Sequence, residues 1–565
     1  MKKRFYLVLT LAVMAVACFT SCKSNLKPLA SDYIQAEPQP LELIAGQVPV
    51  TINVTFPANW FDKKATVVVT PVLRYNGGES AGSSYVFQGE KVAGNGQTIS
   101  QKNGGNVVLK SSFAYIPAMQ KSELYLAFKA QIGNKPVDLP AVKIGDGVLA
   151  TAALLSAATE APAIAADKFQ RVTTEAYDAN LLFLIQQADL RVSELKKADV
   201  TNWKSTVKSA ELAPNQNVDI EISAYASPDG GYELNEKLSE KREANTKKYL
   251  VSELKKEKVS APINAKYTAQ DWDGFRRLVE KSNIQDKDLI LRVLSMYSDS
   301  EQREREIKNI SAVYSTLANE ILPQLRRSRL TANVETIGKS DAEITVLAAS
   351  NPRALTVEEL LYAATLTPVA AQKATIYNKV IDLFPNDPRG YNNLGVVQYA
   401  QGKISAAEDL FKKATNITSS LPEANLNLGY VALANGNRTQ AEQYISKAAN
   451  AQGFGNAQGL LSVLDGNYAK AAQSFGSTAS NNAALSQILS KDYNKASGTL
   501  NAIANPDATT DYLKAIVGAR TNNLSQVTSN LKHAIAKDSS FATKALNDVE
   551  FAKYLKDSSF LNALK

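Results

Sequence analysis

The sequence predicts a multidomain protein: an all-β sandwich first, an α+β domain in the middle and an all-α helical repeat at the end. Three observations predict this order. Short alternating apolar stretches with turn residues between them run from about residue 33 to 149. Strand-like and helix-like stretches are mixed between residues 175 and 345. From residue 354 onward the strand patterns disappear and a period of 34 residues appears.

The first predicted domain covers residues 33–149. Residues 49–56 read PVTINVTF, so every second side chain is apolar and shares one face of a strand. Residues 65–75, ATVVVTPVLRY, follow as a second strand. Asn-Gly turn signals punctuate the rest, at residues 76–77, 95–96 and 103–104. This spacing predicts a sandwich of immunoglobulin-like type that serves as a spacer or docking module.

The first 21 residues are predicted to be an export signal. Lys2, Lys3 and Arg4 precede an apolar stretch, and small residues follow it. The stretch is shorter than the roughly 20 apolar residues that cross a bilayer. We therefore expect no lasting transmembrane helix there.

A cysteine directly after the apolar stretch predicts lipidation. Cys22, in the sequence FTSCKSN, resembles the lipobox cysteine of bacterial lipoproteins, in the variant common in Bacteroidetes. The resemblance implies acyl chains such as palmitate on Cys22, a tether over residues 22–32 and attachment to the outer membrane. Cys18 is a competing match, and ordinary cleavage that leaves a secreted chain is a further alternative. Residues 23–27 carry no acid, which favours a chain that faces the periplasm.

Charge and composition exclude several functional classes. The formal net charge is +8, but the basic residues are dispersed, so no nucleic-acid partner is predicted. Cys18 and Cys22 are the two cysteines and His533 is the one histidine, which removes thiol catalysis and Cys/His zinc sites from the exported chain. Ser193 and Lys196 match a Ser-x-x-Lys motif whose companion motifs are missing. We predict a protein that is not an enzyme, with no catalytic residue, metal or cofactor.

The second predicted domain covers residues 175–345. A stretch of small residues at 150–174 precedes it as a linker. Strands are expected at residues 181–185, 217–227 and 330–334, a helix at 198–210, and a helical insertion at 258–322. The mixture predicts an α+β fold.

A turn in this domain carries a binding motif. The strand that ends at Ala226 is followed by SPDGG and then by a helix start. The spacing of the polar residues resembles the OmpA-like C-terminal domain, a family that binds peptidoglycan. There an aspartate takes the ammonium and an arginine the carboxylate of the stem peptide. The resemblance implies the following peptidoglycan-binding candidates: Ser227, Asp229, Asn235 and Arg242.

The turn departs from the family's pattern at one position. Ser227 stands at the position of the family's aspartate, and Asp229 is the substitute that we consider. The alternative interpretation is that these residues only stabilise a turn and the start of a helix.

The third predicted domain covers residues 354–565. Residues 391–414 align with residues 425–448, and each matched residue, such as Gly395 with Gly429, is offset by 34. This pattern resembles the tetratricopeptide repeat, in which small residues let the two helices of a hairpin approach closely. Shorter copies occur at residues 466–475, 491–500 and 522–535, and an amphipathic cap at 544–555.

The repeat resemblance also implies a concave groove. In such repeats the first helix of each hairpin lines the groove, which nominates Asn392, Tyr399, Glu423 and Tyr430 as contacts to a partner protein. The alternative is that the two tyrosines only pack between hairpins.

The combined architecture resembles the lipoproteins of Bacteroidetes that join OmpA-like and tetratricopeptide modules. The resemblance implies a non-enzymatic, lipid-anchored protein of the cell envelope. It would link the outer membrane to peptidoglycan, or scaffold an envelope complex through its repeats, or do both. The alternative is a pure protein scaffold of a secretion or surface-structure assembly that does not bind peptidoglycan.

Overall fold

The computed structural model describes residues 26–565, without the side chains of residues 311–313. The predicted signal segment and both cysteines, Cys18 and Cys22, lie outside the described residues. The chain divides into two compact units, one of residues up to Ala166 together with Val380–Lys565, the other Asp167–Lys379. Within residues 26–565, no helix is both long enough and apolar enough to cross a bilayer.

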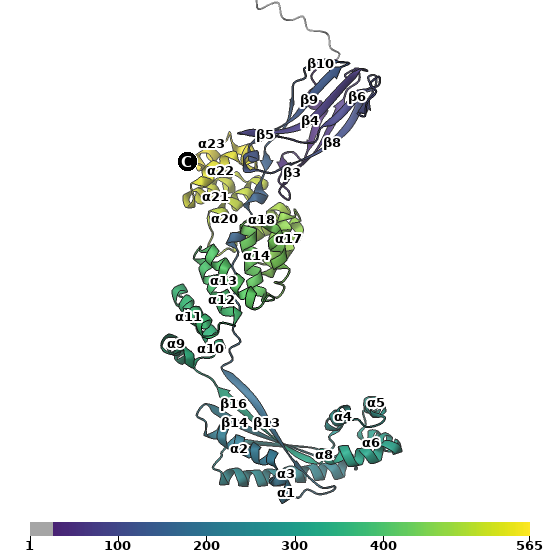
Figure 1. Ribbon diagram of the computed structural model, residues 1–565, viewed down its shortest axis with the longest axis vertical. Helices are drawn as coiled ribbons and strands as arrows, with labels where there is room; N and C mark the ends of the chain where they lie inside the picture. Colours follow the sequence, from purple (N-terminus) through teal and green to yellow (C-terminus); the bar gives the residue numbers. More distant parts are fainter. Residues whose placement is uncertain (1–25) are drawn as a thin grey trace, which may run out of the picture. The chain divides into compact units, whose positions relative to one another are not determined.

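The first unit begins with two β-sheets that share one core. The smaller sheet has the order β1-β3-β8, and the larger has the order β10-β9-β4-β6-β7, with β11 beside β9 and β5 beside β4 (Figure 1). β2 and β12 form a separate two-stranded parallel sheet. The strands are β1 (Ile34–Glu37), β2 (Leu41–Glu42), β3 (Gln47–Phe56), β4 (Ala65–Tyr75), β5 (Gly78–Ala81), β6 (Tyr85–Gly89), β7 (Gln97–Ile99), β8 (Gly105–Ala114), β9 (Ser122–Ile132), β10 (Lys135–Val137), β11 (Val142–Asp146) and β12 (Val148–Leu149).

The strand-rich start of the chain is confirmed. Val50, Ile52 and Val54 alternate into the core from β3, as the sequence pattern predicts. Both sheets contribute to the same buried cluster, for example Leu109 from β8 and Leu126 from β9. Apolar burial between two sheets is therefore what holds this part of the unit together.

The helical end of the chain is also confirmed. Five helical hairpins follow one another within the described residues of the first unit: α12 (Pro388–Ala400) with α13 (Ile404–Ile417), α14 (Pro422–Ala434) with α15 (Arg438–Ile445), α16 (Phe454–Leu464) with α17 (Tyr468–Phe475), α18 (Asn481–Leu489) with α19 (Tyr493–Asn501), and α20 (Ala508–Arg520) with α21 (Leu524–Lys537). They end in α22 (Ser540–Asn547), the 3₁₀ helix η7 (Val549–Tyr554) and α23 (Ser558–Ala563).

Each hairpin turns through a residue with positive φ, at the same place relative to its helices. These residues are Gly402, Gly436, Gly466, Lys491 and Asn522. Two of the five are not glycine, so the left-handed turn is kept even where a side chain makes that backbone conformation unfavourable. The shortened copies seen in the sequence are therefore complete hairpins in the structure.

The second unit is built around a four-stranded sheet of order β13-β16-β14-β15. β14 and β15 are parallel and the other neighbours are antiparallel. Helices α2 and α3 pack on this sheet through one core, which includes Trp203 of α2 and Leu250 of α3 (Figure 1). The elements are β13 (Val172–Leu182), α1 (Val192–Leu195), α2 (Ala198–Leu212), β14 (Gln216–Tyr225), α3 (Tyr232–Lys256), β15 (Ile263–Thr268) and β16 (Arg327–Ile337).

The helices between β15 and β16 form a second core in this unit. Phe275, Ile290 and Leu317 are buried together there. The helices are α4 (Trp272–Lys281), α5 (Lys287–Met296), α6 (Ser300–Asn309), α7 (Ser311–Thr316), the π-helical η5 (Leu317–Ile321) and α8 (Leu322–Leu325). The insertion predicted at residues 258–322 was placed too early, because β15 lies inside that range and belongs to the sheet. Most of β15 is exposed, so it lacks the alternation that marks a strand.

Helices α9 (Asp341–Ser350) and α10 (Val357–Ala363) complete the second unit, and α11 (Ala370–Leu383) spans the boundary between the units.

Candidate functional site

The first helices of the hairpins hold a segment of the chain itself. Residues 150–166, predicted to be part of a free linker, run along the first helices of the hairpins and hydrogen-bond to them. We call these residues the groove segment. The prediction of a linker over 150–174 was therefore wrong, because residues 150–166 are bound and β13 already begins at Val172.

Three asparagines hold the groove segment by its backbone. Asn393 of α12 accepts a hydrogen bond from the N–H of Ala165 (2.8 Å) and donates one to the C=O of the same residue (2.9 Å). Asn427 of α14 does the same with Ala163, at 2.6 and 2.9 Å. Asn482 of α18 does so with Ser156, at 3.0 and 2.8 Å. Each side chain thus pairs with one residue as a neighbouring β-strand would.

The three asparagines are equivalent positions of the repeat. Each lies nine residues before the positive-φ residue of its own hairpin turn, namely Gly402, Gly436 and Lys491. All three side chains are at most 2% exposed. The hydrogen bonds of Asn393 and Asn427 to the groove segment are buried, and those of Asn482 to Ser156 are partly buried. A repeated two-point contact of this kind recognises an extended backbone rather than particular side chains.

Small side chains let the groove segment lie this deep. Ala163 and Ala165 are 5% and 2% exposed, whereas Ile164 between them is 44% exposed. This alternation is that of an extended strand with one face against the helices. Ala163 belongs to the same core cluster as Leu426 and Tyr430 of α14. A larger side chain at residue 163 or 165 would have to displace packed helices.

One buried carboxylate lies in the middle of the groove segment. Glu160 is 5% exposed and accepts hydrogen bonds from Asn482 Nδ2 (2.8 Å) and Asn456 Nδ2 (2.9 Å). Thr478 Oγ1 donates to Asn456 Oδ1 and so orients that amide. Burial raises the pKa of Glu160, and the two amide donors oppose the shift.

Both ends of the groove segment are also fixed. At its start, Thr151 donates a hydrogen bond to Glu550 of η7, and Glu550 forms an ion pair with Arg520 at 2.7 Å. At its end, Arg389 Nη1 donates to the C=O of Ala166 (3.4 Å). The groove segment is therefore held along its whole length.

Of the four predicted groove residues, Asn392 and Tyr399 form hydrogen bonds to the groove segment, and Tyr430 and Glu423 do not. Asn392 is fully buried and donates to the C=O of Ala163 at 3.0 Å, and Tyr399 OH donates to the C=O of Ala158 at 3.5 Å. Tyr430 is buried beside the groove segment, where burial raises its pKa, but its OH donates to the C=O of Gly453 at 2.9 Å. Glu423 is half-buried at the first turn of α14 and forms none of the hydrogen bonds described above.

Sequence reasoning missed Asn393, Asn427 and Asn482. The first two occupy the same column of the 34-residue alignment, in YNNLG and NLNLG, so a repeated asparagine was visible there.

The structure brings three of the predicted peptidoglycan-binding residues together at one turn. Ser227 Oγ donates to Asp229 Oδ1 at 2.5 Å, and Asn235 Nδ2 donates to the C=O of Ser227 (3.1 Å) and of Gly230 (2.8 Å). Asp229 also forms an ion pair with Arg326 at 2.8 Å, in which both side chains are mostly buried. The carboxylate thus already has a cationic partner within the chain.

Arg242 is directed at backbone carbonyls. Its side chain is fully buried and donates from Nε to Gln187 (2.9 Å), from Nη1 to Tyr225 (2.9 Å) and from Nη2 to Leu184 (3.2 Å). Burial, and next the charge of Arg326, lower the pKa of Arg242 to about 10. The guanidinium fork that would take a ligand carboxylate is used to join the loop after β13 to the end of β14.

Comparisons with known proteins add little to this geometry. No family model and no curated protein matches the chain. Among solved structures, a tetratricopeptide repeat protein from Parabacteroides merdae ATCC 43184 is 14% identical over 52% of this chain and 99% of its own, with a TM-score of 0.24. PilW, a type IV pilus biogenesis factor, is 13% identical over 40% of this chain and 98% of its own, with a TM-score of 0.26.

The Cut9-Hcn1 hetero-tetramer of the APC/C matches at 14% identity over 66% of this chain and 82% of its own, with a TM-score of 0.26. TM-scores this low carry no argument about fold or function. The assignment of helical repeats therefore rests on the 34-residue period and on the hairpins themselves.

Proposed function

We propose that this protein is a non-enzymatic scaffold of the cell envelope, fastened to the outer membrane by a lipid on Cys22 and facing the periplasm. The observation that supports the scaffold best is the filled groove: the chain's own backbone occupies the face with which such repeats would hold a partner. A bound groove segment makes the sandwich and the hairpins one rigid support. The lipid anchor and the location rest on the sequence.

The filled groove changes where a partner protein binds. A segment tethered within the same chain has an effective concentration in the millimolar range or above, so a free peptide competes poorly with it. Asn392 and Tyr399, predicted as partner contacts, are already used by the groove segment. In this proposal the partner proteins contact outward surfaces, such as those of the second helices α13 and α15.

Photo-crosslinking in intact cells tests this assignment. We would place a photoreactive phenylalanine at Tyr399, inside the groove, and in a second strain at the exposed Lys413 of α13. The proposal predicts that the probe at 399 links only within its own chain, to residues 150–166 and to the helices that pack around it, while the probe at 413 links to another envelope protein. Crosslinking of the probe at 399 to another protein would contradict it.

Binding to peptidoglycan is a second candidate function. One observation favours it: Ser227, Asp229 and Asn235 gather at the turn that the OmpA-like resemblance implies. The internal partners of Asp229 and Arg242 favour the scaffold without wall binding.

Co-sedimentation with purified sacculi separates the two functions. The scaffold proposal predicts that the chain stays in solution. It also predicts that neither Asp229→Asn nor the control Asp288→Asn, at an exposed acid of α5, changes the amount that sediments with sacculi. Sedimentation that Asp229→Asn abolishes and Asp288→Asn preserves would establish wall binding instead.

A further inference from the structure

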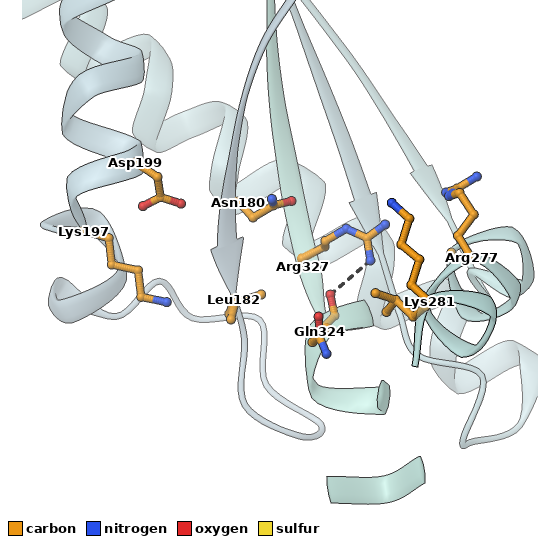
Figure 2. A pocket seen from close by; sticks show the side chains of 10 residues that line it. Asn180, Leu182, Lys197, Asp199, Arg277, Lys281, Gln324 and Arg327 are labelled. Carbon is orange, nitrogen blue, oxygen red and sulfur yellow. Dashed lines mark hydrogen bonds between the residues drawn. The ribbon is translucent and has the colours of Figure 1, made fainter. Parts of the chain in front are cut away.

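The second unit contains a basic cleft whose lining includes no residue of the predicted peptidoglycan-binding turn and none of the groove segment. It has a volume of about 350 Å³ and lies between the end of β13, the start of α2, α4 and the start of β16. Figure 2 shows Lys197 and Asp199 on one side, Arg277, Lys281 and Arg327 on the other, and Asn180 between them. The volume is that of a small-molecule site.

One cation of the cleft is firmly pre-positioned. Arg327 Nη2 donates to Asp271 Oδ2 at 2.8 Å, Nη1 donates to the C=O of Gln324 at 3.0 Å, and the guanidinium lies 4.7 Å from the ring centre of Tyr225. Asp271 in turn caps α4, because Oδ1 accepts from the N–H of Gly274 at 2.7 Å. The charge of Arg327 is therefore fixed in place and balanced by Asp271.

Two other cations have no such role in the fold. Arg277 and Lys281 are exposed and lie one turn apart on α4, and their side chains form no ion pair or hydrogen bond with any of the described residues. Like charges at this spacing weaken a helix. Both side chains line the same cleft, so an anion bound there would relieve their repulsion.

The opposite side of the cleft is mixed in charge. Lys197 forms an ion pair with Glu194 at 2.6 Å, but Arg191 shares that carboxylate at 2.9 Å, so the group keeps an excess positive charge. Asp199 beside it is an acceptor, and its Oδ1 takes the N–H of Val200 at 2.9 Å. A carboxylate facing the cleft disfavours a ligand that is anionic throughout and suits one that carries hydroxyl groups.

We propose that this cleft binds a phosphate monoester on a small polyol, with the phosphate between Arg277 and Lys281 and the hydroxyl groups toward Asp199. A monoester carries close to two negative charges at neutral pH, which matches two unpaired cations. Guanidinium and ammonium groups are the usual protein ligands of phosphate. A soluble polyol phosphate and the phosphomonoester headgroup of a lipid both present this chemistry.

Calorimetry on the exported chain tests the site, with Cys22→Ser to prevent lipidation. Glycerol 3-phosphate is the probe, and glycerol and the diester glycerophosphocholine are the controls. We expect binding of glycerol 3-phosphate that the double variant Arg277→Gln/Lys281→Gln weakens by at least about tenfold. The matched variant Lys247→Gln/Lys248→Gln removes two exposed charges from α3 of the same unit and should leave affinity within about twofold. Melting curves confirm that both variants are folded.

Vesicles distinguish the two sources of the phosphate. Phosphatidylcholine vesicles that contain phosphatidic acid present the monoester, and vesicles that contain phosphatidylglycerol present a diester. Retention on the first kind alone, lost with Arg277→Gln/Lys281→Gln, assigns a lipid headgroup, and binding of free glycerol 3-phosphate alone assigns a soluble ligand. The proposal is overturned if neither probe binds, if the diester binds equally well, or if the control variant loses as much affinity as the cleft variant.

Discussion

The contact that defines this molecule at the scale of single residues is an asparagine amide paired with one backbone residue. The amide has a donor and an acceptor side by side in one plane, so it can satisfy the N–H and the C=O of an extended residue together. Among residues 26–565 the pairing occurs three times, at Asn393, Asn427 and Asn482. Removing one amide takes away the acceptor of a backbone N–H and one donor of the C=O, although the C=O of Ala163 keeps Asn392 and that of Ser156 keeps Thr159.

Asn427→Ala tests the value of one such pairing. Ala163 would keep a buried N–H and a buried C=O, although Asn392 still donates to that C=O. We expect a loss of about 2–4 kcal/mol in the free energy of unfolding. Denaturant titration followed by circular dichroism measures it. Asn416→Ala, at an exposed position of α13, is the control and should change stability by less than about 0.5 kcal/mol.

The buried carboxylate of Glu160 predicts a dependence on pH. Its pKa is raised in the folded chain above the usual 4.5, chiefly by burial, so the folded state takes up a proton before the unfolded state does. Its charged form therefore destabilises the fold above the raised pKa. That cost disappears as the pH falls through the raised pKa toward 4.5.

The difference between the wild type and Glu160→Gln isolates this group. The wild type should gain stability relative to the variant as the pH is lowered from neutral toward 4.5, in denaturant titrations at a series of pH values. A difference that stays constant with pH, or grows in the opposite direction, would show that the carboxylate is not buried.

The residue scale is also where the sequence was least informative. The nominated Asn392 and Tyr399 do contact a peptide, but nothing in residues 150–166 indicated that this peptide is the chain itself. Recognition through the backbone needs only small side chains such as Ala163 and Ala165, and small residues are equally typical of a free linker. Arg242 was found by its spacing, whereas its three carbonyl partners come from segments that only the fold brings together.

At the scale of elements, a glycine facing a large side chain determines how closely two helices of a hairpin pack. A Cβ added at Gly395 would lie 2.6 Å from the ring of Phe411, and one at Gly459 would lie 2.5 Å from the ring of Phe475. Both rings are buried. Gly395 is thus a position of close helix approach, as the sequence predicted, and Gly459 is another. Gly402 and Gly436, which the 34-residue alignment also matches, instead form the hairpin turns and have open space where a Cβ would lie.

Gly395→Ala and Gly498→Ala should change stability in opposite directions. Alanine favours a helix by up to about 1 kcal/mol over glycine. At Gly498, in the exposed interior of α19, nothing lies within 4 Å of the new methyl group, so the melting temperature should rise. At Gly395 the clash with Phe411 should outweigh that gain and lower stability by about 1–2 kcal/mol. Thermal melts of both variants check the two signs, and a stabilised Gly395→Ala would contradict the close packing.

Elements were predictable wherever one face is buried and the other is exposed. The second strand was expected at residues 65–75, and β4 has those bounds. β13 begins earlier than the strand expected at 181–185. Its first part was not predicted because Val172–Asp178 are all exposed, so their sequence shows no alternation of buried and exposed positions. Such strands are held by backbone hydrogen bonds to a neighbour, here β16, which no sequence pattern reports.

At the scale of the molecule, the groove segment joins the sandwich to the hairpins within the first unit. It begins one residue after β12 of the sandwich and passes contacts on α18, α14 and α12. A separate contact, from Tyr468 OH to the C=O of Leu43 at 3.1 Å, joins the same two parts. The groove segment thus joins the two parts in two ways, because it is covalently continuous with the sandwich and is hydrogen-bonded to the hairpins.

Ala163→Glu and Ile164→Glu test whether the strand is bound over its whole length. A charge at the buried residue 163 should expel the groove segment, whereas the same change at the exposed residue 164 should leave it in place. Thermolysin cleaves exposed extended chain beside apolar residues. We expect rapid cleavage within residues 150–166 of the first variant and resistance in the second, as judged by mass spectrometry of the fragments. Equal cleavage of both variants would argue against a bound strand.

The most direct measurement of the central claim is hydrogen exchange at the amides of Ser156, Ala163 and Ala165 in the intact chain. These N–H groups donate to Asn482, Asn427 and Asn393, so they should exchange orders of magnitude more slowly than an unstructured peptide, and the protection should be lost locally in Asn427→Ala. Exchange at the rate of a free linker would show that the groove is empty and open to a partner.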